Sequence, residues 1–247
     1  MTFPKYKNKH LEESLFLPQD FLQYKKKKMK LPKKIIIIYS DKALNYYKRK
    51  YKPTKIKFSN QIIIWKHKEV GLIKMLGIGC PMAVTLMEEI IAMGGKEFLN
   101  IGVSGGLNKD GFFLCNKALR DEGTSYHYLP HGHYTFPDKE LTIKLEKCLL
   151  KNKVNFQYGA TWTIDAPYRE TKKEVEKYSK IGIKTVEMEA SALFALGQVR
   201  KVKVASAFFV SDVLGKKWEP RFDKKETQNN LNKLVDVAVE CLLKWQS

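Results

Sequence analysis

Short apolar runs separated by polar and glycine-containing links recur along the chain from residue 35 onward. Four consecutive isoleucines, Ile35–Ile38, are typical of a buried central strand. Further runs predict a hairpin and three more strands, at Gln61–Trp65 with Val70–Leu76, then Phe98–Ile101, Tyr158–Ile164 and Val204–Val210. Helical spacing predicts helices that start near Ala43 and cover Met82–Met93, Lys139–Leu150, residues 171–180 and Asn229–Trp245. This alternation favours an α/β fold with a mostly parallel sheet covered on both faces.

Residues 1–30 differ from the rest of the chain because they are polar and basic and include the run Lys25–Lys28. Runs of like charge are usually exposed and mobile, so we expect an arm ahead of the domain. The remaining chain shows no internal repeat and no second change of composition. With 247 residues in all, the chain is long enough to bury a substantial core, and we expect one domain over residues 31–247.

Composition narrows the class of protein. A hydrophobic content of 44% excludes a disordered chain. The four cysteines are scattered and indicate reduced thiols in a cytoplasmic protein. No apolar run is long enough for a membrane helix, and the N-terminus lacks the apolar stretch of a signal peptide. His131 and His133 have no third ligand spaced nearby, so no metal is expected.

The net charge of +19 has two interpretations. A basic surface can bind nucleic acid or concentrate anionic substrates. Lysine supplies most of this charge, whereas nucleic-acid readers rely on arginine for bidentate contacts. A solvated, lysine-rich surface is therefore the simpler interpretation, and nucleic-acid binding is disfavoured.

Candidate chemistry concentrates in the stretch Thr185–Asp212. Glu187, Met188 and Glu189 stand where a helix is predicted to begin, so the two carboxylates would point about 200° apart and at most one would face a given pocket. A carboxylate accepts two hydroxyl hydrogens at once, which suits the vicinal diol of a ribose. The alternative is that acidic residues simply favour a helix N-terminus.

Asp212 follows an apolar run and is predicted to end a strand, where open α/β sheets place ligand-binding side chains. It is a candidate general acid, with its pKa raised in a dry site, or else a helix cap. The segment Gly102–Gly106, which contains Ser104 and Gly105, follows another predicted strand. Its backbone N–H groups could meet an anion or a sugar oxygen, or its glycines could serve only a tight turn.

Taken together, these segments resemble the nucleoside phosphorylase family, which includes uridine phosphorylases, hexameric purine nucleoside phosphorylases and methylthioadenosine nucleosidases. The resemblance rests on Gly77–Pro81, Asn100–Leu107, Val186–Ala190 and Val210–Asp212, in the family's order. Arg120–Pro130 is similar to a uridine phosphorylase segment, and Thr161–Arg169 occupies the position of the family's base-site loop.

The resemblance implies a three-layer α/β/α sandwich around a twisted mixed sheet and an enzyme that cleaves the N-glycosidic bond of a nucleoside. It implies no cofactor, with phosphate as a co-substrate, and a homo-oligomer, either a dimer or a hexamer. His10 is similar in position to a histidine that reaches the sugar of a neighbouring subunit.

The same resemblance assigns roles within the site. Met188 and Glu189 would hold the ribose hydroxyls, with Glu187 beside the base, and Asp212 would protonate a purine at N7. The loop that ends in Arg169 would supply walls of the base pocket, namely Trp162 and Tyr168.

Three departures concern the phosphate end. The family's Gly-Asp-Pro-x-Arg loop is replaced by Ser40–Leu44, its second phosphate arginine by Asn100, and a phosphate-contacting Ser or Thr by Val103. Lysine cannot reproduce the bidentate fork of arginine. Three hypotheses follow: a nucleoside phosphorylase that forms ribose 1-phosphate, a hydrolytic nucleosidase, and a non-catalytic protein that binds nucleosides or nucleic acid. Base preference stays open, since Asp212 indicates a purine and Arg120–Pro130 indicates uridine.

Overall fold

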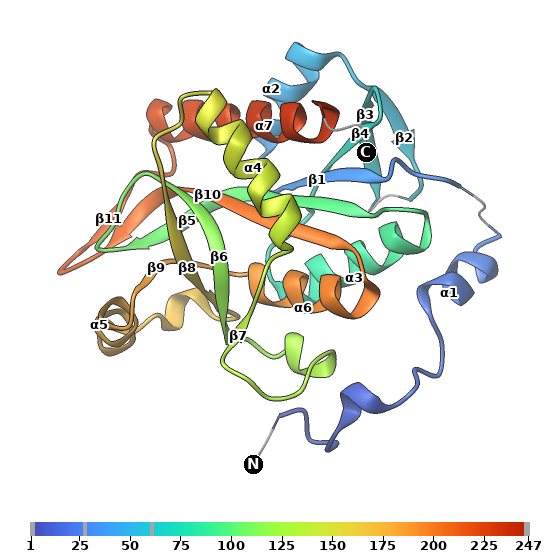
Figure 1. The fold of residues 1–247 in the computed structure, drawn as a ribbon, viewed down its shortest axis with the longest axis horizontal. Coiled ribbons are helices and arrows are strands. Elements are labelled where there is room, and N and C mark those ends of the chain that lie inside the picture. Colours follow the sequence, from blue (N-terminus) through green and yellow to red (C-terminus); the bar gives the residue numbers. More distant parts are fainter. Residues whose placement is uncertain (1–2, 27–28, 60–61, 245–247) are drawn as a thin grey trace.

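Eleven strands form one mixed sheet, with helices on both of its faces (Figure 1). The computed structural model describes residues 3–26, 29–59 and 62–244. Within these residues the strand order is β11-β10-β6-β8-β9-β5-β1-β4-β3-β2, and β7 pairs with β6. This architecture confirms the predicted α/β/α fold.

The strands are β1 (Lys34–Ile38), β2 (Thr54–Lys57), β3 (Ile63–His67), β4 (Val70–Lys74), β5 (Glu97–Leu107), β6 (Phe112–Asp121), β7 (Tyr134–Thr135), β8 (Phe156–Ile164), β9 (Ile183–Glu187), β10 (Lys203–Leu214) and β11 (Trp218–Pro220). The helices are α1 (Pro18–Tyr24), α2 (Asp41–Tyr51), α3 (Cys80–Ala92), α4 (Lys139–Lys151), α5 (Lys172–Lys180), α6 (Ala190–Arg200) and α7 (Lys225–Lys244). Three short 3₁₀ turns are η1 (Lys9–Leu11), η2 (Ser125–His127) and η3 (Pro167–Arg169).

The isoleucines of β1 show how the two faces of the sheet are built. Successive side chains of a strand point to opposite faces. Ile35 and Ile37 accordingly pack in a core cluster with side chains of α3 and α6, whereas Ile36 and Ile38 pack with side chains of α2, α4 and α7. All four are fully buried, and each such burial stabilises the fold by about 1.5–3 kcal/mol. The isoleucine run is therefore a central strand, as predicted.

Five strands close on themselves in one half of the sheet. β5 pairs with β10 in parallel and with β9 antiparallel. β10 pairs with β6, β6 with β8, and β8 with β9, which completes the ring. The ends of β5, β9 and β10 consequently meet in a single region.

β5 and β10 are longer than the sequence predicted, and the glycine segment is strand rather than turn. Gly105 and Gly106 lie inside β5, in register with the second half of β10. A Cβ on Gly105 would lie 2.5 Å from Leu214 Cδ1, and one on Gly106 would lie 2.1 Å from the backbone oxygen of Lys109. These glycines are needed because neighbouring atoms approach closely, which local sequence does not reveal.

The predicted helices are present with small shifts. α3, α4 and α5 match the predictions to within two residues at either end. α7 begins at Lys225, four residues before the predicted start at Asn229, while Trp245 lies outside the described residues. No described helix is both long and apolar enough to cross a membrane.

Part of the predicted N-terminal arm is packed on the domain. α1 contacts α3, and its Leu22 is buried in the same core cluster as Ile35. Leu15 and Phe16, just ahead of α1, are exposed. Within the run Lys25–Lys28, Lys27 and Lys28 lie outside the described residues.

Candidate active site

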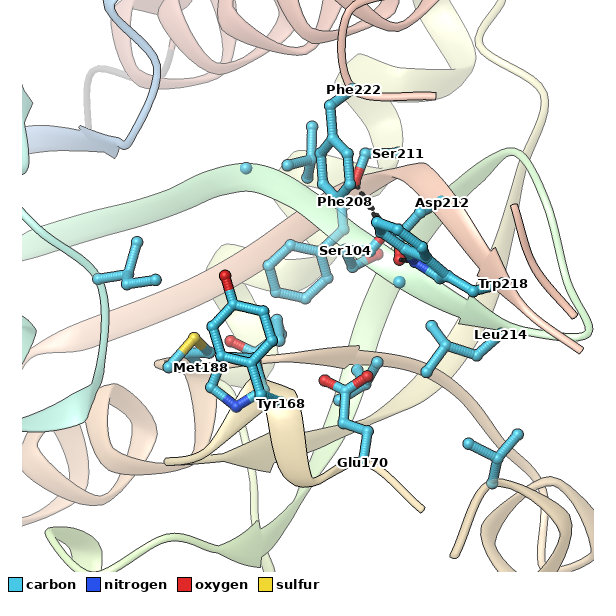
Figure 2. Close-up of a pocket in the computed structure, with 18 of the residues that line it drawn as sticks. Ser104, Tyr168, Glu170, Met188, Phe208, Ser211, Asp212, Leu214, Trp218 and Phe222 are labelled. Carbon is cyan, nitrogen blue, oxygen red and sulfur yellow. Dashed lines mark hydrogen bonds between the residues drawn. The ribbon is translucent and has the colours of Figure 1, made fainter. Parts of the chain in front are cut away.

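A cavity of about 900 Å³ lies where β5, β9 and β10 meet (Figure 2). This volume is within the range of small-molecule sites. Its walls come from Gly102–Gly105 of β5, the β9–α6 junction at Val186–Glu189, β10 and the β10–β11 link, and the segment from Pro167 to Val175. The ring of strand pairings thus brings together segments far apart in the sequence.

The predicted helix start at Glu187 is wrong, and the correction changes how the two carboxylates lie. β9 ends at Glu187, and α6 begins only at Ala190. Glu187 Oε2 accepts hydrogen bonds from Glu189 N at 2.8 Å and Ala190 N at 2.7 Å. Because these residues form a turn rather than a helix, both Glu187 and Glu189 line the cavity.

Glu187 holds this turn in place. Its Oε1 accepts a hydrogen bond from Thr163 Oγ1 at 2.6 Å. The same hydroxyl accepts one from Ser191 N at 3.0 Å. Both carboxylate oxygens therefore have donors from the protein, so Glu187 caps α6 and positions its neighbours rather than offering a free carboxylate to a ligand.

Met188 and Glu189 are tied to the start of α3. Glu189 Oε1 accepts a hydrogen bond from Gly79 N at 2.6 Å, and Cys80 Sγ donates to the Met188 carbonyl at 3.1 Å. Burial raises the pKa of Glu189, and the adjacent charge of Glu187 raises it further. Burial also raises the pKa of Glu187, against the opposing effect of its three donors. This carboxylate pair therefore retains protons more readily than exposed glutamates do.

Asp212 lies on the other side of the cavity, inside β10 rather than at its end. Ser211 is an extra residue in the β5–β10 register, a β-bulge that turns Asp212 toward Gly105. Asp212 Oδ1 accepts from Ser211 Oγ at 2.9 Å, and Oδ2 accepts from Trp218 Nε1 at 2.8 Å. Both carboxylate oxygens of Asp212 therefore have a donor from the protein, which fixes the orientation of this side chain at the cavity.

Trp218 is a site residue that sequence reasoning missed. It lies on β11, lines the cavity and is 62% exposed, although its indole N–H is directed at Asp212. Only the β10–β11 hairpin brings it back to Asp212, six residues earlier. A Gly-Lys-Lys-Trp sequence after a strand is the one signal that predicts such a hairpin.

Ser104 and Gly105 line the cavity between these two sides. The Ser104 hydroxyl is buried and has no hydrogen-bond partner within the described part of the chain. A buried, unpaired hydroxyl costs about 1–3 kcal/mol. A hydrogen bond from the Ser104 hydroxyl to a polar ligand atom would offset that cost.

Of the remaining predicted residues, some line the cavity and others do not. Tyr168 is fully exposed on η3 and, like Met188, lines the cavity (Figure 2). Trp162 is not among the cavity-lining residues: it is completely buried, and its Nε1 donates to Asp121 Oδ2 at 2.8 Å. Thr163, the next residue on β8, points toward the site and contacts Glu187, so Trp162 points to the opposite face of the strand. Arg169 is exposed, and neither Arg169 nor His10 lines the cavity.

A second, smaller cavity of about 350 Å³ shares Val103, Ser211 and Phe222 with the first. It is also lined by residues of the predicted phosphate end, Ser40, Asp41 and Lys42. No arginine in the described part of the chain lines either cavity.

Polar groups at the predicted phosphate end form ion pairs and hydrogen bonds with other residues of the protein. Lys42 Nζ lies 3.4 Å from Asp223 Oδ1, and both side chains are largely exposed. Asn100, which the resemblance places at the position of the family's second phosphate arginine, is completely buried. Its Oδ1 accepts from Tyr39 OH at 2.8 Å, and its Nδ2 donates to Ser206 Oγ at 3.2 Å. Asn100 is therefore a packing residue with a satisfied amide.

Among the described residues, no cluster of His, Cys, Asp and Glu has the arrangement of a metal site. Three of the four acidic residues that line the cavity, Glu187, Glu189 and Asp212, are held by N–H and O–H donors. Their arrangement is suited to bind hydroxyl and N–H groups of an organic ligand.

Comparison with known proteins adds four findings. The family model described as "Phosphorylase superfamily" matches residues 35–244. A purine nucleoside phosphorylase of Plasmodium vivax is 26% identical over 202 residues, covering 78% of this chain and 79% of the relative. A uridine phosphorylase of Treponema pallidum is 30% identical over 149 residues, covering 54% and 58% respectively. The crystal structure of an AMP nucleosidase from Bacteroides thetaiotaomicron superposes with a TM-score of 0.75 at 18% identity, covering 93% of this chain and all of that one.

Proposed function

Because the chain belongs to the phosphorylase superfamily, we propose that it cleaves the N-glycosidic bond of a purine nucleoside and releases the free base. One observation carries this proposal. Glu189, tied to Gly79, and Asp212, held by Ser211 and Trp218, line opposite sides of one cavity. Carboxyl groups from two separate segments at one cavity suit a ligand with hydroxyls at one end and a nitrogenous ring at the other.

The ribose would lie beside Met188 and Glu189. The Glu189 carboxyl is fixed through Gly79 N, which leaves its second oxygen to accept a ribose hydroxyl. Breaking a glycosidic bond develops positive charge on the sugar ring. The Glu189 carboxyl is already held by Gly79 N, so it can bind the ribose hydroxyls in that state without having to reorganise.

The base would lie between Asp212 and the aromatic side chains of Tyr168 and Phe208, which also line the cavity. Asp212 would donate a proton or a hydrogen bond to N7 of the purine as the base leaves. A uracil ring presents no imidazole nitrogen that can be protonated. This difference favours purine over uridine.

Phosphate is the first candidate for the group that accepts the ribose. The supporting observations are the two phosphorylases among the relatives and the second cavity, where Lys42 supplies a cation and Ser211 a hydroxyl. Water is the second candidate. It is supported by the lack of arginine at both described cavities and by the pairing of Lys42 with Asp223.

The test is base release from adenosine, guanosine, inosine, uridine and AMP, each with and without phosphate. We expect release from at least one purine nucleoside, and faster release than from uridine. Formation of ribose 1-phosphate only when phosphate is present supports phosphorolysis, and equal rates with free ribose support hydrolysis. Binding of nucleosides without any base release would overturn the proposed activity.

We also propose that copies of the chain associate in the cytoplasm. Four large apolar side chains at the cavity, Ile78, Tyr168, Trp218 and Phe222, are at least half exposed in the single chain. A neighbouring copy would cover them. The four cysteines are buried without a disulfide, in keeping with a reducing compartment. Light scattering on the purified protein tests the association, and a purely monomeric mass would overturn it.

A further inference from the structure

Three lysine side chains line the cavity and have no role in the chemistry proposed above. Lys216 and Lys217 lie on the link between β10 and β11, and Lys172 is the first residue of α5. All three side chains are exposed. Within the described residues, no hydrogen bond or ion pair joins any of these ammonium groups to an acceptor. The cavity therefore presents three cations that the described part of the chain does not neutralise.

The fold brings these lysines to the end of the cavity where the base is proposed to lie. β10 and β11 pair from Asp212 with Pro220 to Leu214 with Trp218, so the link between them stays close to Asp212. Figure 2 shows Leu214 and Trp218 on the same side of the cavity as Asp212. Leu214 also packs against the apolar cluster that contains Val175 of α5. The two segments that carry the lysines are thus neighbours at the base end.

The stability of α5 does not explain Lys172. The first turn of α5 contains Lys172 and Lys173, although the helix dipole disfavours positive charge there. Thr171 and Glu174 already cap the helix, because Glu174 Oε2 accepts from Thr171 N at 3.0 Å and Thr171 Oγ1 accepts from Glu174 N at 3.3 Å. Residues that oppose a local rule are expected at functional sites.

The acidic residues of the cavity leave an excess of positive charge at this end. Glu187 and Glu189 belong to the β9–α6 junction, where the ribose is proposed to lie. Glu170 and Asp212 remain, against three lysines. The cavity volume of about 900 Å³ is near the upper limit of small-molecule sites, so there is space beyond a purine ring. An anionic group attached to the base would be attracted into that space.

Resting on the proposed function, we infer that the substrate is a purine nucleoside whose base carries a carboxylate, and that Lys172, Lys216 and Lys217 bind this group. With the ribose beside Glu189 and the base beside Asp212, an exocyclic substituent of the purine extends toward the β10–β11 link. A 5′-phosphate is also an anion, but it is attached to the ribose and lies at the other end of the ligand. The position of the charge on the ligand therefore distinguishes the two sources.

Four nucleosides test the inference: adenosine, N6-(carboxymethyl)adenosine, the methyl ester of that acid, and AMP. The ester keeps nearly the shape of the acid and removes its charge. We expect kcat/KM for the acid to exceed that for the ester by about tenfold or more at low salt, since charge-assisted hydrogen bonds are lost in the ester. This preference should weaken as salt is added, because exposed charges are screened. AMP should gain no comparable advantage over adenosine.

A variant that combines Lys172→Gln, Lys216→Gln and Lys217→Gln should lower the ratio of acid to ester to about one, because no cation is then left to distinguish them. Lys173→Gln is the matched control. Lys173 is exposed in the same turn of α5 but does not line the cavity, so this variant should keep the preference for the acid. Circular dichroism checks that both variants are folded.

Three results would overturn the inference. Equal kcat/KM for acid and ester in the unmodified protein would mean that the carboxylate is not recognised. An unchanged ratio in the triple variant would mean that other groups bind it. A larger gain for AMP over adenosine than for the acid over the ester would place the anion at the ribose.

Calorimetry separates this inference from the proposed activity. The free bases N6-(carboxymethyl)adenine and its methyl ester report the same preference without any cleavage. If the unmodified protein cleaves none of the four nucleosides but binds the acid more tightly than the ester, the proposed activity fails and the carboxylate site stands. If adenosine is cleaved and the two bases bind equally, the activity stands and the carboxylate site is wrong.

Discussion

Thr163→Val tests whether a single buried hydroxyl holds the turn that carries Met188 and Glu189. Valine keeps the shape of the side chain and removes only the hydroxyl. Thr163 is completely buried on β8, so no water replaces the lost group. The substitution deletes the hydrogen bond to Glu187 Oε1 at 2.6 Å and leaves Ser191 N without its acceptor at 3.0 Å.

The magnitude follows from these two losses. A hydrogen bond to a charged group contributes about 1.5–3 kcal/mol, and a buried donor left unpaired costs about 1–3 kcal/mol. The free energy of unfolding should therefore fall by about 2.5–6 kcal/mol, which is a large part of the stability of a typical domain. Because Glu187 also loses one of its donors, the turn should loosen and kcat/KM for nucleosides should fall as well.

Denaturant titration followed by circular dichroism measures the first effect, and steady-state base release measures the second. Thr185→Val, on the adjacent strand β9, is the matched control. The Thr185 hydroxyl is buried with no hydrogen-bond partner among the described residues. The same substitution there should be neutral or stabilising. If the unfolding free energies of Thr163→Val and Thr185→Val differ by less than about 1 kcal/mol, the role given to Thr163 and Glu187 is wrong.

Three other predictions concern the cavity. Trp218→Phe keeps an aromatic ring but removes the N–H donor of Asp212, so kcat/KM for purine nucleosides should fall about tenfold; unchanged kinetics would contradict the role of this bond. Burial raises the pKa of Glu189, so the folded state binds more protons than the unfolded chain above the usual glutamate pKa. Unfolding free energy should therefore decrease as the pH rises from about 5 to 8, and Glu189→Gln should flatten this decrease; a parallel pH profile in the variant would refute it. Gly105→Ala would place a Cβ 2.5 Å from Leu214 Cδ1 and should destabilise the protein by about 1–3 kcal/mol, measured as Tm; an unchanged Tm would show that the strands can separate there.

Predictions from periodicity were accurate where the pattern is local. The isoleucine run of β1 and the helix α4 each have one buried face, and spacing alone identifies that face. The predicted ends of β5 and β10 were too early. In β5 the reason is that glycine normally disfavours strands. Here Gly105 and Gly106 continue β5, since the close approach of β10 and of Lys109 leaves no room for a side chain.

The site was predicted in part. The residue types at Glu187–Glu189 and Asp212 indicated a ligand with hydroxyls and a basic ring, and all of them line the cavity. The interpretation of Glu187–Glu189 as a helix start was wrong, because the capping bonds to Glu187 hold a turn before α6. Trp162 was also misplaced, since strand alternation on β8 directs it into the core.

The sequence by itself determined the α/β class, the succession of the main strands and helices along the chain, and three acidic residues of the candidate site, Glu187, Glu189 and Asp212. These properties depend on hydrophobic periodicity and on residue type, which can be recognised from residues close together in the sequence. Only the tertiary structure decided the chemical state of each acid. Burial and the neighbouring charge of Glu187 raise the pKa of Glu189, whereas Ser211 and Trp218 donate hydrogen bonds to Asp212. The physical reason is that solvation and hydrogen bonding of a carboxyl depend on groups brought together from distant strands, which no local pattern encodes.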